Sequence, residues 1–403
     1  MKTRNTGLIL CLFGVALTAV SCTDDSSPTE PTSAAPEAAT LSASATAAAL
    51  SFYQVSASED RTCGVTTTNQ AYCWGRGILG DGGSSNFTPG PAPVAVAGGH
   101  RFRQISSGAA YTCGVTTDNR AYCWGNNYGG QLGDGTKTAR LTPVPAAASL
   151  RFREITTGYL TTCGLTTGNR VYCWGSNAGG IMGTGATSAS SGNPPTQIAG
   201  GRTYNQVDMG WDNGCAVTYS HEIYCWGRND YGQLGDGSTV KVRFTPRRVS
   251  GTRSFTQVSA GSQHTCAVTS AKRAFCWGHG SYGQIGDGST LHRRAPRQVA
   301  GTVLFERVTA GGATTCAEST NNRAYCWGNN EWGQLGNGTT TARLKPVAVA
   351  GGLFFTQLSA GVGYSCGVTS GNRAYCWGDN IYGGLGDGTT TERRTPTPVV
   401  GPS

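Results

Sequence analysis

The feature that most constrains this chain is a set of seven cysteine pairs, each separated by ten positions. The first cysteines of successive pairs lie 50 to 52 residues apart. A fixed period of this length indicates repeated units that bury their apolar surfaces against their neighbours. The pairs are Cys63–Cys73, Cys113–Cys123, Cys163–Cys173, Cys215–Cys225, Cys266–Cys276, Cys316–Cys326 and Cys366–Cys376.

Each repeat contains the same series of short extended segments. In the second repeat these are "FRQISSG", "TCGVTT", "RAYCWG" and, after the glycine-rich loop "NNYGGQLGDGT", the segment "TPVPA". Four short strands separated by turn residues, with no helical period, predict an all-β chain. The 61 glycines among 403 residues, about twice the usual share, agree with many tight turns.

Seven four-stranded units in tandem predict a seven-bladed β-propeller with repeats of about 50 residues. The propeller would occupy residues 51–403. Either strands from both chain ends latch the ring, or each repeat forms one whole blade, and the sequence leaves both open. The expected repeats are residues 52–100, 101–150, 151–202, 203–253, 254–303, 304–353 and 354–403.

The cysteine spacing predicts one disulfide in each blade. Cys113 and Cys123 are symmetric about Asp118, so a three-residue turn would place them directly opposite each other. Opposed residues of a hairpin lie within disulfide reach. The third turn position often needs a positive φ, which asparagine tolerates, and it is Asn in five repeats but His221 and Lys272 in two. A metal site fits less well, because no pair has a second ligand pair at zinc-finger spacing. Reduced core cysteines also fit less well, because an exported chain enters an oxidising compartment.

The amino terminus predicts export. Residues 1–21 combine a basic start with an apolar segment, as in a signal peptide, and "LTAVSC" resembles a bacterial lipobox in which Cys22 would be lipidated. Ala19 stands where leucine is commoner, and "AVS" also fits an ordinary signal-peptidase site. We therefore expect an outer-membrane or cell-surface lipoprotein, with a secreted or periplasmic protein as the alternative. Residues 22–50, rich in Ser, Thr, Pro and Ala, predict a flexible tether.

We expect no enzyme activity, cofactor or metal. The five histidines occupy unlike repeat positions, and no nucleophile elbow or phosphate loop is present. Loop carboxylates recur at Asp81, Asp134, Asp236, Asp287 and Asp387, but Asp-Gly is ordinary turn chemistry and calcium-loop spacing is missing. An envelope enzyme, for example one acting on polysaccharide at a polar site on the propeller axis, remains the alternative.

The unit "SAGSQHTCAVTSAKRAFCWGHGSYGQIGDGST" at residues 259–290 resembles the repeat of the regulator of chromosome condensation family. The resemblance extends from Phe52 to Val400 and implies a seven-bladed propeller. Members of this family include a nuclear exchange factor for a small GTPase that binds chromatin, a plant ultraviolet-B sensor and a secreted bacterial β-lactamase inhibitor. Export makes exchange activity the less expected function. Light sensing is not favoured either, because Trp211 alone stands before a first cysteine.

The positions that depart from the repeat predict two candidate sites. Aromatic and apolar residues on adjacent units, in the turn between the first two strands, form a candidate binding cluster: Tyr159, Leu160, Trp211 and Asp212. A positive patch on outer edges would contain Arg243, Arg247, Arg248, Arg293, Arg294, Arg297, Arg393 and Arg394. Ordinary surface variation and a solvated rim are the respective alternatives.

The composition also bears on the partner. The net charge is +9, but charged residues make up only 13% of the chain. No base-reading motif is present, so we do not expect nucleic acid as a partner. We expect a monomer that binds a protein or an anionic envelope component through one face and is held to a membrane by a lipid on Cys22.

Overall fold

The protein is described here by a computed structural model, which covers residues 50–83 and 89–402. The predicted signal peptide 1–21, the lipidation site Cys22 and all of the predicted tether 22–50 except Leu50 lie outside the described residues. Within the described ranges no helix has the length and hydropathy needed to cross a membrane. The one helical segment there is the short 3-10 helix η1 (Ala178–Gly180).

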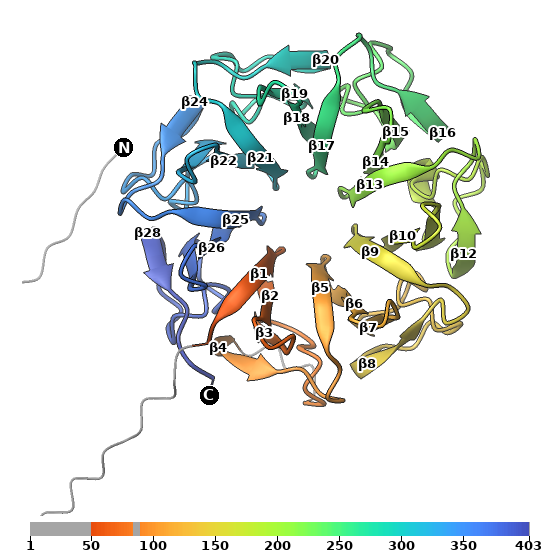
Figure 1. The fold of residues 1–403 in the computed structure, drawn as a ribbon, viewed down its shortest axis with the longest axis horizontal. Coiled ribbons are helices and arrows are strands. Elements are labelled where there is room, and N and C mark those ends of the chain that lie inside the picture. The colour runs from red at the N-terminus through yellow and green to blue at the C-terminus, as the bar shows by residue number, and fades with distance from the viewer. Residues whose placement is uncertain (1–49, 84–88, 403) are drawn as a thin grey trace, which may run out of the picture. The chain divides into compact units, whose positions relative to one another are not determined.

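Seven four-stranded antiparallel sheets stand around a common axis, which confirms the predicted propeller (Figure 1). Each sheet consists of four strands that are consecutive in the sequence, here termed A to D from the axis outward. The first blade contains β1 to β4 and the last contains β25 to β28, so no strand is exchanged between the two chain ends. Of the two closures left open by the sequence, the chain uses one repeat per blade.

The strand bounds repeat with little variation. The A strands are β1 (Phe52–Ala57), β5 (Phe102–Ser107), β9 (Phe152–Thr157), β13 (Tyr204–Met209), β17 (Phe255–Ala260), β21 (Phe305–Ala310) and β25 (Phe355–Ala360). The B strands are β2 (Arg61–Thr66), β6 (Tyr111–Thr116), β10 (Thr161–Thr166), β14 (Asn213–Thr218), β18 (His264–Thr269), β22 (Thr314–Ser319) and β26 (Tyr364–Thr369).

The two outer strands of each blade are equally regular. The C strands are β3 (Ala71–Gly75), β7 (Ala121–Gly125), β11 (Val171–Gly175), β15 (Ile223–Arg228), β19 (Ala274–Gly278), β23 (Ala324–Gly328) and β27 (Ala374–Gly378). The D strands are β4 (Gly90–Ala95), β8 (Arg140–Ala146), β12 (Asn193–Gln197), β16 (Val242–Arg248), β20 (Arg293–Gln298), β24 (Arg343–Ala348) and β28 (Arg393–Pro398).

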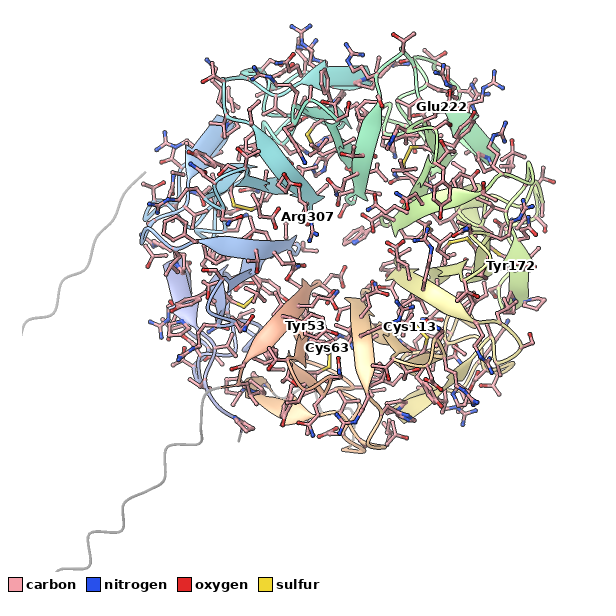
Figure 2. All side chains as sticks on the ribbon, in the orientation of Figure 1. Tyr53, Cys63, Cys113, Tyr172, Glu222 and Arg307 are labelled. Atoms are coloured by element: carbon pink, nitrogen blue, oxygen red, sulfur yellow. A yellow bond between two sulfur atoms is a disulfide. The ribbon has the colours of Figure 1, made fainter. Side chains whose placement is uncertain are left out.

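One disulfide joins strands B and C of every blade, as predicted from the spacing (Figure 2). Cys113 lies directly opposite Cys123 in the register of β6 and β7, and the Cα atoms of each pair are 4.0 to 4.1 Å apart. The turn geometry holds even where asparagine is replaced: φ is 67° at Asn119, 61° at His221 and 59° at Lys272. The fold therefore imposes this turn on less suitable residues.

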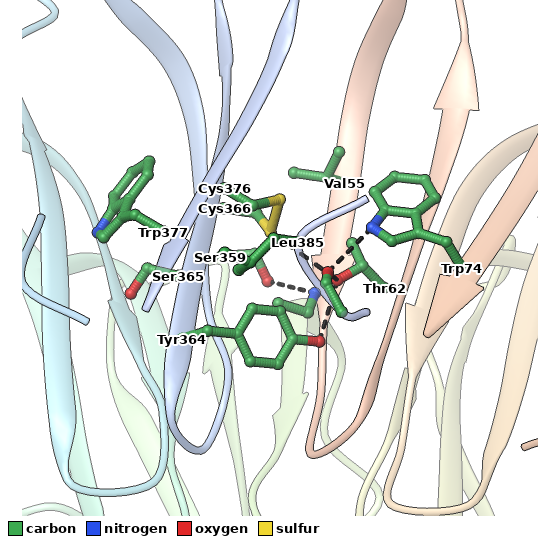
Figure 3. The surroundings of a disulfide bond; sticks show 12 residues. Val55, Thr62, Trp74, Ser359, Tyr364, Ser365, Cys366, Cys376, Trp377 and Leu385 are labelled. Atoms are coloured by element: carbon green, nitrogen blue, oxygen red, sulfur yellow. Dashed lines mark hydrogen bonds between the residues drawn. A yellow bond between two sulfur atoms is a disulfide. The ribbon is translucent and has the colours of Figure 1, made fainter. Parts of the chain in front are cut away.

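A buried tryptophan follows the second cysteine of each repeat and packs between blades. All seven indoles have no exposed surface, and six donate their N–H to a carbonyl of the preceding blade. At the seam between the last and first blades, Trp74 Nε1 donates to Gly384 O at 2.9 Å (Figure 3). Trp124 lacks such an acceptor among the described residues. These tryptophans form inter-blade core rather than a ligand site.

The A strands bind each other around the axis through a first ring of side chains. In five blades a glutamine carboxamide both donates to and accepts from the backbone of the next A strand. Gln54 donates to Ile105 O at 3.0 Å and accepts from Ile105 N at 2.9 Å. Because the side chain satisfies two backbone groups at once, it acts like one additional ladder pair. The glutamines are Gln54, Gln104, Gln206, Gln257 and Gln357.

A second ring lies two residues further along each A strand and is complete. In every blade a side-chain oxygen accepts a backbone N–H from the next blade, and Ser359 closes the ring by accepting from Ala57 N at 2.9 Å (Figure 3). The acceptors are Ser56, Ser106, Thr156, Asp208, Ser259, Thr309 and Ser359. In this second ring the seam between the chain ends thus uses the same kind of contact as the six others.

Two blades depart from the glutamine ring. Glu154 replaces glutamine in the third blade, and its Oε2 accepts from Val207 N at 3.3 Å. Burial, opposed by the hydrogen bond from Val207, raises the pKa of Glu154 to about 8. A protonated Glu154 has the O–H needed to donate like a carboxamide, whereas the carboxylate has none.

In the sixth blade Arg307 takes the glutamine position and cannot accept a hydrogen bond. Glu318, which pairs with Arg307 in the register of β21 and β22, accepts from Leu358 N instead. Burial raises the pKa of Glu318 to about 7. An acid from strand B thus supplies the acceptor that strand A lacks.

Candidate binding face

The turns between strands A and B and the loops between strands C and D lie at the same end of the blades and form what we term the AB face. The AB turns encircle the mouth of the axial opening, since one or more residues of each turn line it. This confirms that the seven variable turns share one face. They comprise residues 58–60, 108–110, 158–160, 210–212, 261–263, 311–313 and 361–363.

Exposed apolar side chains gather on the AB face. Fifteen large apolar or aromatic residues are exposed in the described part of the chain. Nine of them belong to AB turns or CD loops, against four in the turns, connections and terminal segment at the opposite end. This asymmetry indicates that the AB face is the more hydrophobic end of the propeller and the more suitable one for binding another protein. The nine are Tyr128, Tyr159, Trp211, Val240, Tyr282, Leu291, Trp332, Val362 and Ile381.

The structure brings two of the four predicted cluster residues into contact. The rings of Tyr159 and Trp211, on adjacent blades, have centroids 5.8 Å apart and planes inclined by 44°. Their exposed fractions are 48% and 37%. Rings that touch each other while open to solvent can bury a large apolar area against a partner with little loss of side-chain entropy.

Leu160 and Asp212 flank this aromatic pair but are half-buried. The backbone carbonyl of Leu160 accepts from Ser176 N of the neighbouring CD loop. Asp212 lies 3.9 Å from the guanidinium of Arg228, and burial, partly offset by Arg228, raises the pKa of Asp212. These two residues are therefore tied to their own blades more than to the aromatic pair.

The CD-loop residues of the AB face were not predicted. Two of them, Tyr282 and Trp332, stand at the recurrent tyrosine of the "YGQLGDGT" loop, so they resembled repeat structure. The available signal was the tryptophan at position 332, where three other loops have tyrosine (Tyr231, Tyr282 and Tyr382) and two have glycine (Gly129 and Gly179). Trp332 is 46% exposed, whereas the seven tryptophans that follow second cysteines are fully buried.

The predicted basic residues lie on the outer strands of the fourth, fifth and seventh blades, and six of the eight have a carboxylate partner. Arg243, Arg293 and Arg393 bind the loop carboxylates Asp236, Asp287 and Asp387 at 2.6 to 2.7 Å. Longer or more exposed pairs involve Arg248, Arg297 and Arg394. Arg247 and Arg294 have no carboxylate within 4 Å among the described residues, so much of the expected positive charge is locally compensated.

The recurrent loop aspartates stabilise their own loops. Asp387 accepts from Thr389 N at 3.0 Å and Thr389 Oγ1 at 2.7 Å, in addition to its ion pair with Arg393. Asp236 and Asp287 make the corresponding contacts with Ser238 and Ser289. Across residues 50–83 and 89–402 no group of three His, Cys, Asp or Glu is placed to hold a metal ion.

The axial cavity, with a volume of about 260 Å³, contains acidic side chains. Glu154 and Asp208 from adjacent blades line it, together with Glu318 and Arg307, which is labelled beside the axis in Figure 2. Each of the three acids accepts a backbone N–H of the next blade. In the structure these three acids therefore hold adjacent blades together.

Comparisons with known proteins identify the repeat. The sequence profile of the RCC1-like domain matches residues 16–304, and that of the regulator of chromosome condensation (RCC1) repeat matches residues 321–368 and 372–403. Among solved structures, human WBSCR16 superposes with a TM-score of 0.71 at 21% identity, over 77% of this chain and 85% of that one. Prp20p from Saccharomyces cerevisiae, whose structure was described with its binding to Gsp1p and histones, gives 0.67 at 17% identity, over 76% and 80%.

Relatives with known activities match over shorter stretches. The ultraviolet-B receptor UVR8 of Arabidopsis thaliana is 38% identical over 95 residues, which are 22% of this chain and 20% of that protein. The probable E3 ubiquitin-protein ligase HERC4 of Homo sapiens is 36% identical over 83 residues, which are 20% of this chain and 8% of that protein. The matched stretches thus span a fifth or less of these two relatives.

Proposed function

Because this chain belongs to the family of RCC1-like domains, we propose that it is a binding scaffold that recognises a protein through its AB face. The observation that carries the proposal is the concentration of exposed aromatic and apolar side chains on that face, centred on the contact between Tyr159 and Trp211. Interfaces depend on such anchors more than on total area. The binding of Gsp1p and histones by Prp20p is a precedent for protein recognition on this fold.

We further propose that binding takes place outside the cytoplasm. Seven disulfides suit an oxidising compartment. The signal-peptide pattern of residues 1–21 supports the same location, and Cys22 would anchor the protein to a membrane. The partner would then be an envelope or extracellular protein, which makes nucleotide exchange on a nuclear GTPase the weaker analogy.

A polysaccharide-directed enzyme is the second candidate, because Glu154 and Asp208 both line the axial cavity and burial raises the pKa of both. Their carboxylates accept N–H groups of Val207 and Ala260, so catalysis would compete with the seam. Glu154→Gln distinguishes the two functions: an enzyme would lose its activity, whereas a scaffold would bind its partner unchanged.

Replacing the aromatic pair should weaken binding. We expect Trp211→Ala to weaken partner binding by about 2 kcal/mol, roughly thirtyfold, and Tyr159→Ala by a smaller amount. The measurement is crosslinking of the full-length protein in intact cells, followed by titration of the purified partner. Tyr219→Ala removes a tyrosine exposed at the opposite end of the propeller and should leave binding unchanged. Equal binding by the Trp211→Ala protein would contradict the proposal.

A further inference from the structure

A groove of about 490 Å³ crosses the AB face over the fourth to seventh blades and the first blade. Its walls carry three exposed aromatic rings, those of Trp211, Tyr282 and Trp332. The same lining contains three carboxylates, from Glu59, Asp60 and Asp379, and no Lys, Arg or His among the described residues. Because Asp60 is already paired with Arg76, the groove combines open π-faces with the carboxylates of Glu59 and Asp379.

The chain itself shows what this combination binds, because the seam between the last and first blades contains a complete example. Arg76 lies on the ring of Tyr382, with its Cζ atom 3.7 Å from the ring centroid, and also binds Asp60. Three positions of the repeat are involved: the CD-loop aromatic of one blade, the residue after "WG" of the next blade, and the last residue of its AB turn. At the seam between the fourth and fifth blades the first two positions hold Tyr231 and His279, whose rings make a T-shaped contact at 4.5 Å, and the third position is the uncharged Gln263.

The seam between the sixth and seventh blades has a different assignment at these three positions. The aromatic is Trp332, the residue after "WG" is Asp379 instead of a base, and the last turn residue is Gly363. A Cβ atom at Gly363 would lie 3.6 Å from Trp332 Cδ1 and 3.8 Å from Asp379 Oδ2. The indole and the carboxylate therefore border one small space, which the glycine leaves open to solvent.

We propose that this space receives an arginine side chain of the protein partner, stacked on the indole of Trp332 and paired with the carboxylate of Asp379. A planar guanidinium can stack on a ring and bind a carboxylate at the same time, as Arg76 does one seam away. Tryptophan is the strongest aromatic partner for a cation. This inference rests on the proposed function, because the arginine belongs to the partner bound on the AB face.

The test uses the tripeptide amide Gly-Arg-Gly and the full-length protein carrying Trp211→Phe. In that protein Trp332 is the only exposed tryptophan, since the other seven are fully buried. We expect the peptide to bind with a millimolar Kd and to protect Trp332 fluorescence from acrylamide quenching. The tripeptide with neutral citrulline should bind roughly tenfold more weakly, and the arginine peptide should weaken as salt is raised.

Two variants locate the effect. Asp379→Asn should weaken the arginine peptide roughly three- to tenfold, whereas Glu392→Gln, which removes a CD-loop acid that does not line the groove, should have no effect. Trp332→Leu should abolish binding in a calorimetric titration. Thermal unfolding of each variant identifies any loss that comes from misfolding.

Equal binding of the two tripeptides, no protection of Trp332, or an Asp379→Asn protein that binds normally would overturn the arginine site. The outcome is separate from that of the proposed function, because the peptide experiment needs no partner. A negative peptide result does not change the expected outcome of the partner titration with the Trp211→Ala protein. Conversely, a partner whose affinity is unchanged by replacement of Tyr159 and Trp211 would refute the proposed binding through the AB face, and the arginine peptide could still bind.

Discussion

Reduction of the seven disulfides should unfold the propeller without any denaturant. Each bridge closes a loop of ten to eleven residues, for which the chain-entropy estimate is roughly 2 to 3 kcal/mol. Seven such contributions sum to about 15 to 20 kcal/mol as an upper figure. Domains of this kind retain a net stability of only about 5 to 15 kcal/mol. The summed contribution of the seven disulfides is therefore comparable to the entire net free energy of unfolding.

The measurement is tryptophan fluorescence and circular dichroism during reduction under native conditions. Seven fully buried indoles make a red shift of the emission a direct report of inter-blade opening. As a control, replacing Cys113 and Cys123 together by serine should cost about 2 to 3 kcal/mol and leave a folded ring. A protein with fourteen free thiols and an unchanged native spectrum would show that packing alone sustains the fold.

Glu154→Gln should stabilise the protein by an amount that grows with pH. The folded pKa of Glu154 is about 8, raised from 4.5 by burial. Between these values the folded state keeps a proton that the unfolded state releases, so the stability contributed by this group falls as pH rises. At pH 8 the substitution should raise the free energy of unfolding by roughly 3 to 5 kcal/mol, whereas at pH 4 the two proteins should have nearly equal stability.

Denaturant titrations of both proteins between pH 4 and pH 8.5 provide this comparison. Asp208, Arg153 and Arg103 also act on Glu154, and all three are the same in both proteins. Gln104→Glu is the matched control, since it places the same acid in the corresponding seam, where Gln104 now binds Ile155. It should introduce a similar loss of stability above pH 5. Parallel pH profiles for the original protein and Glu154→Gln would contradict this account of the seam.

The properties that depend on the repeat could be predicted from the sequence, because the residues that determine them occur in all seven repeats. The blade count, the disulfide between Cys113 and Cys123 and the burial of the tryptophans all follow from one averaged unit. What could not be predicted lies where a single repeat departs from that unit and a neighbouring blade responds. In the sequence Glu318 is one strand residue among many, and only the register places it beside Arg307 and within reach of Leu358 N.

The candidate site follows the same division. Tyr159 and Trp211 were visible as departures on adjacent units, and they do touch. Trp332 was hidden by its agreement with the loop pattern, although it is the more exposed of the two surface tryptophans. The arginines of the expected positive patch were real surface residues, but only the structure shows that Asp236, Asp287 and Asp387 have already neutralised three of them.

Because the first and last blades exchange no strand, closure of the ring does not depend on which blade begins the chain. The seam between them has the glutamine bridge of Gln357, which four other seams share, and the bridge of Ser359, which has a counterpart in all six others. A circularly permuted gene that begins at any other connection between a D strand and the next A strand should therefore encode the same ring. For the same reason a whole repeat could be exchanged between propellers of this kind. The turns and loops that form a binding surface could then be combined one blade at a time.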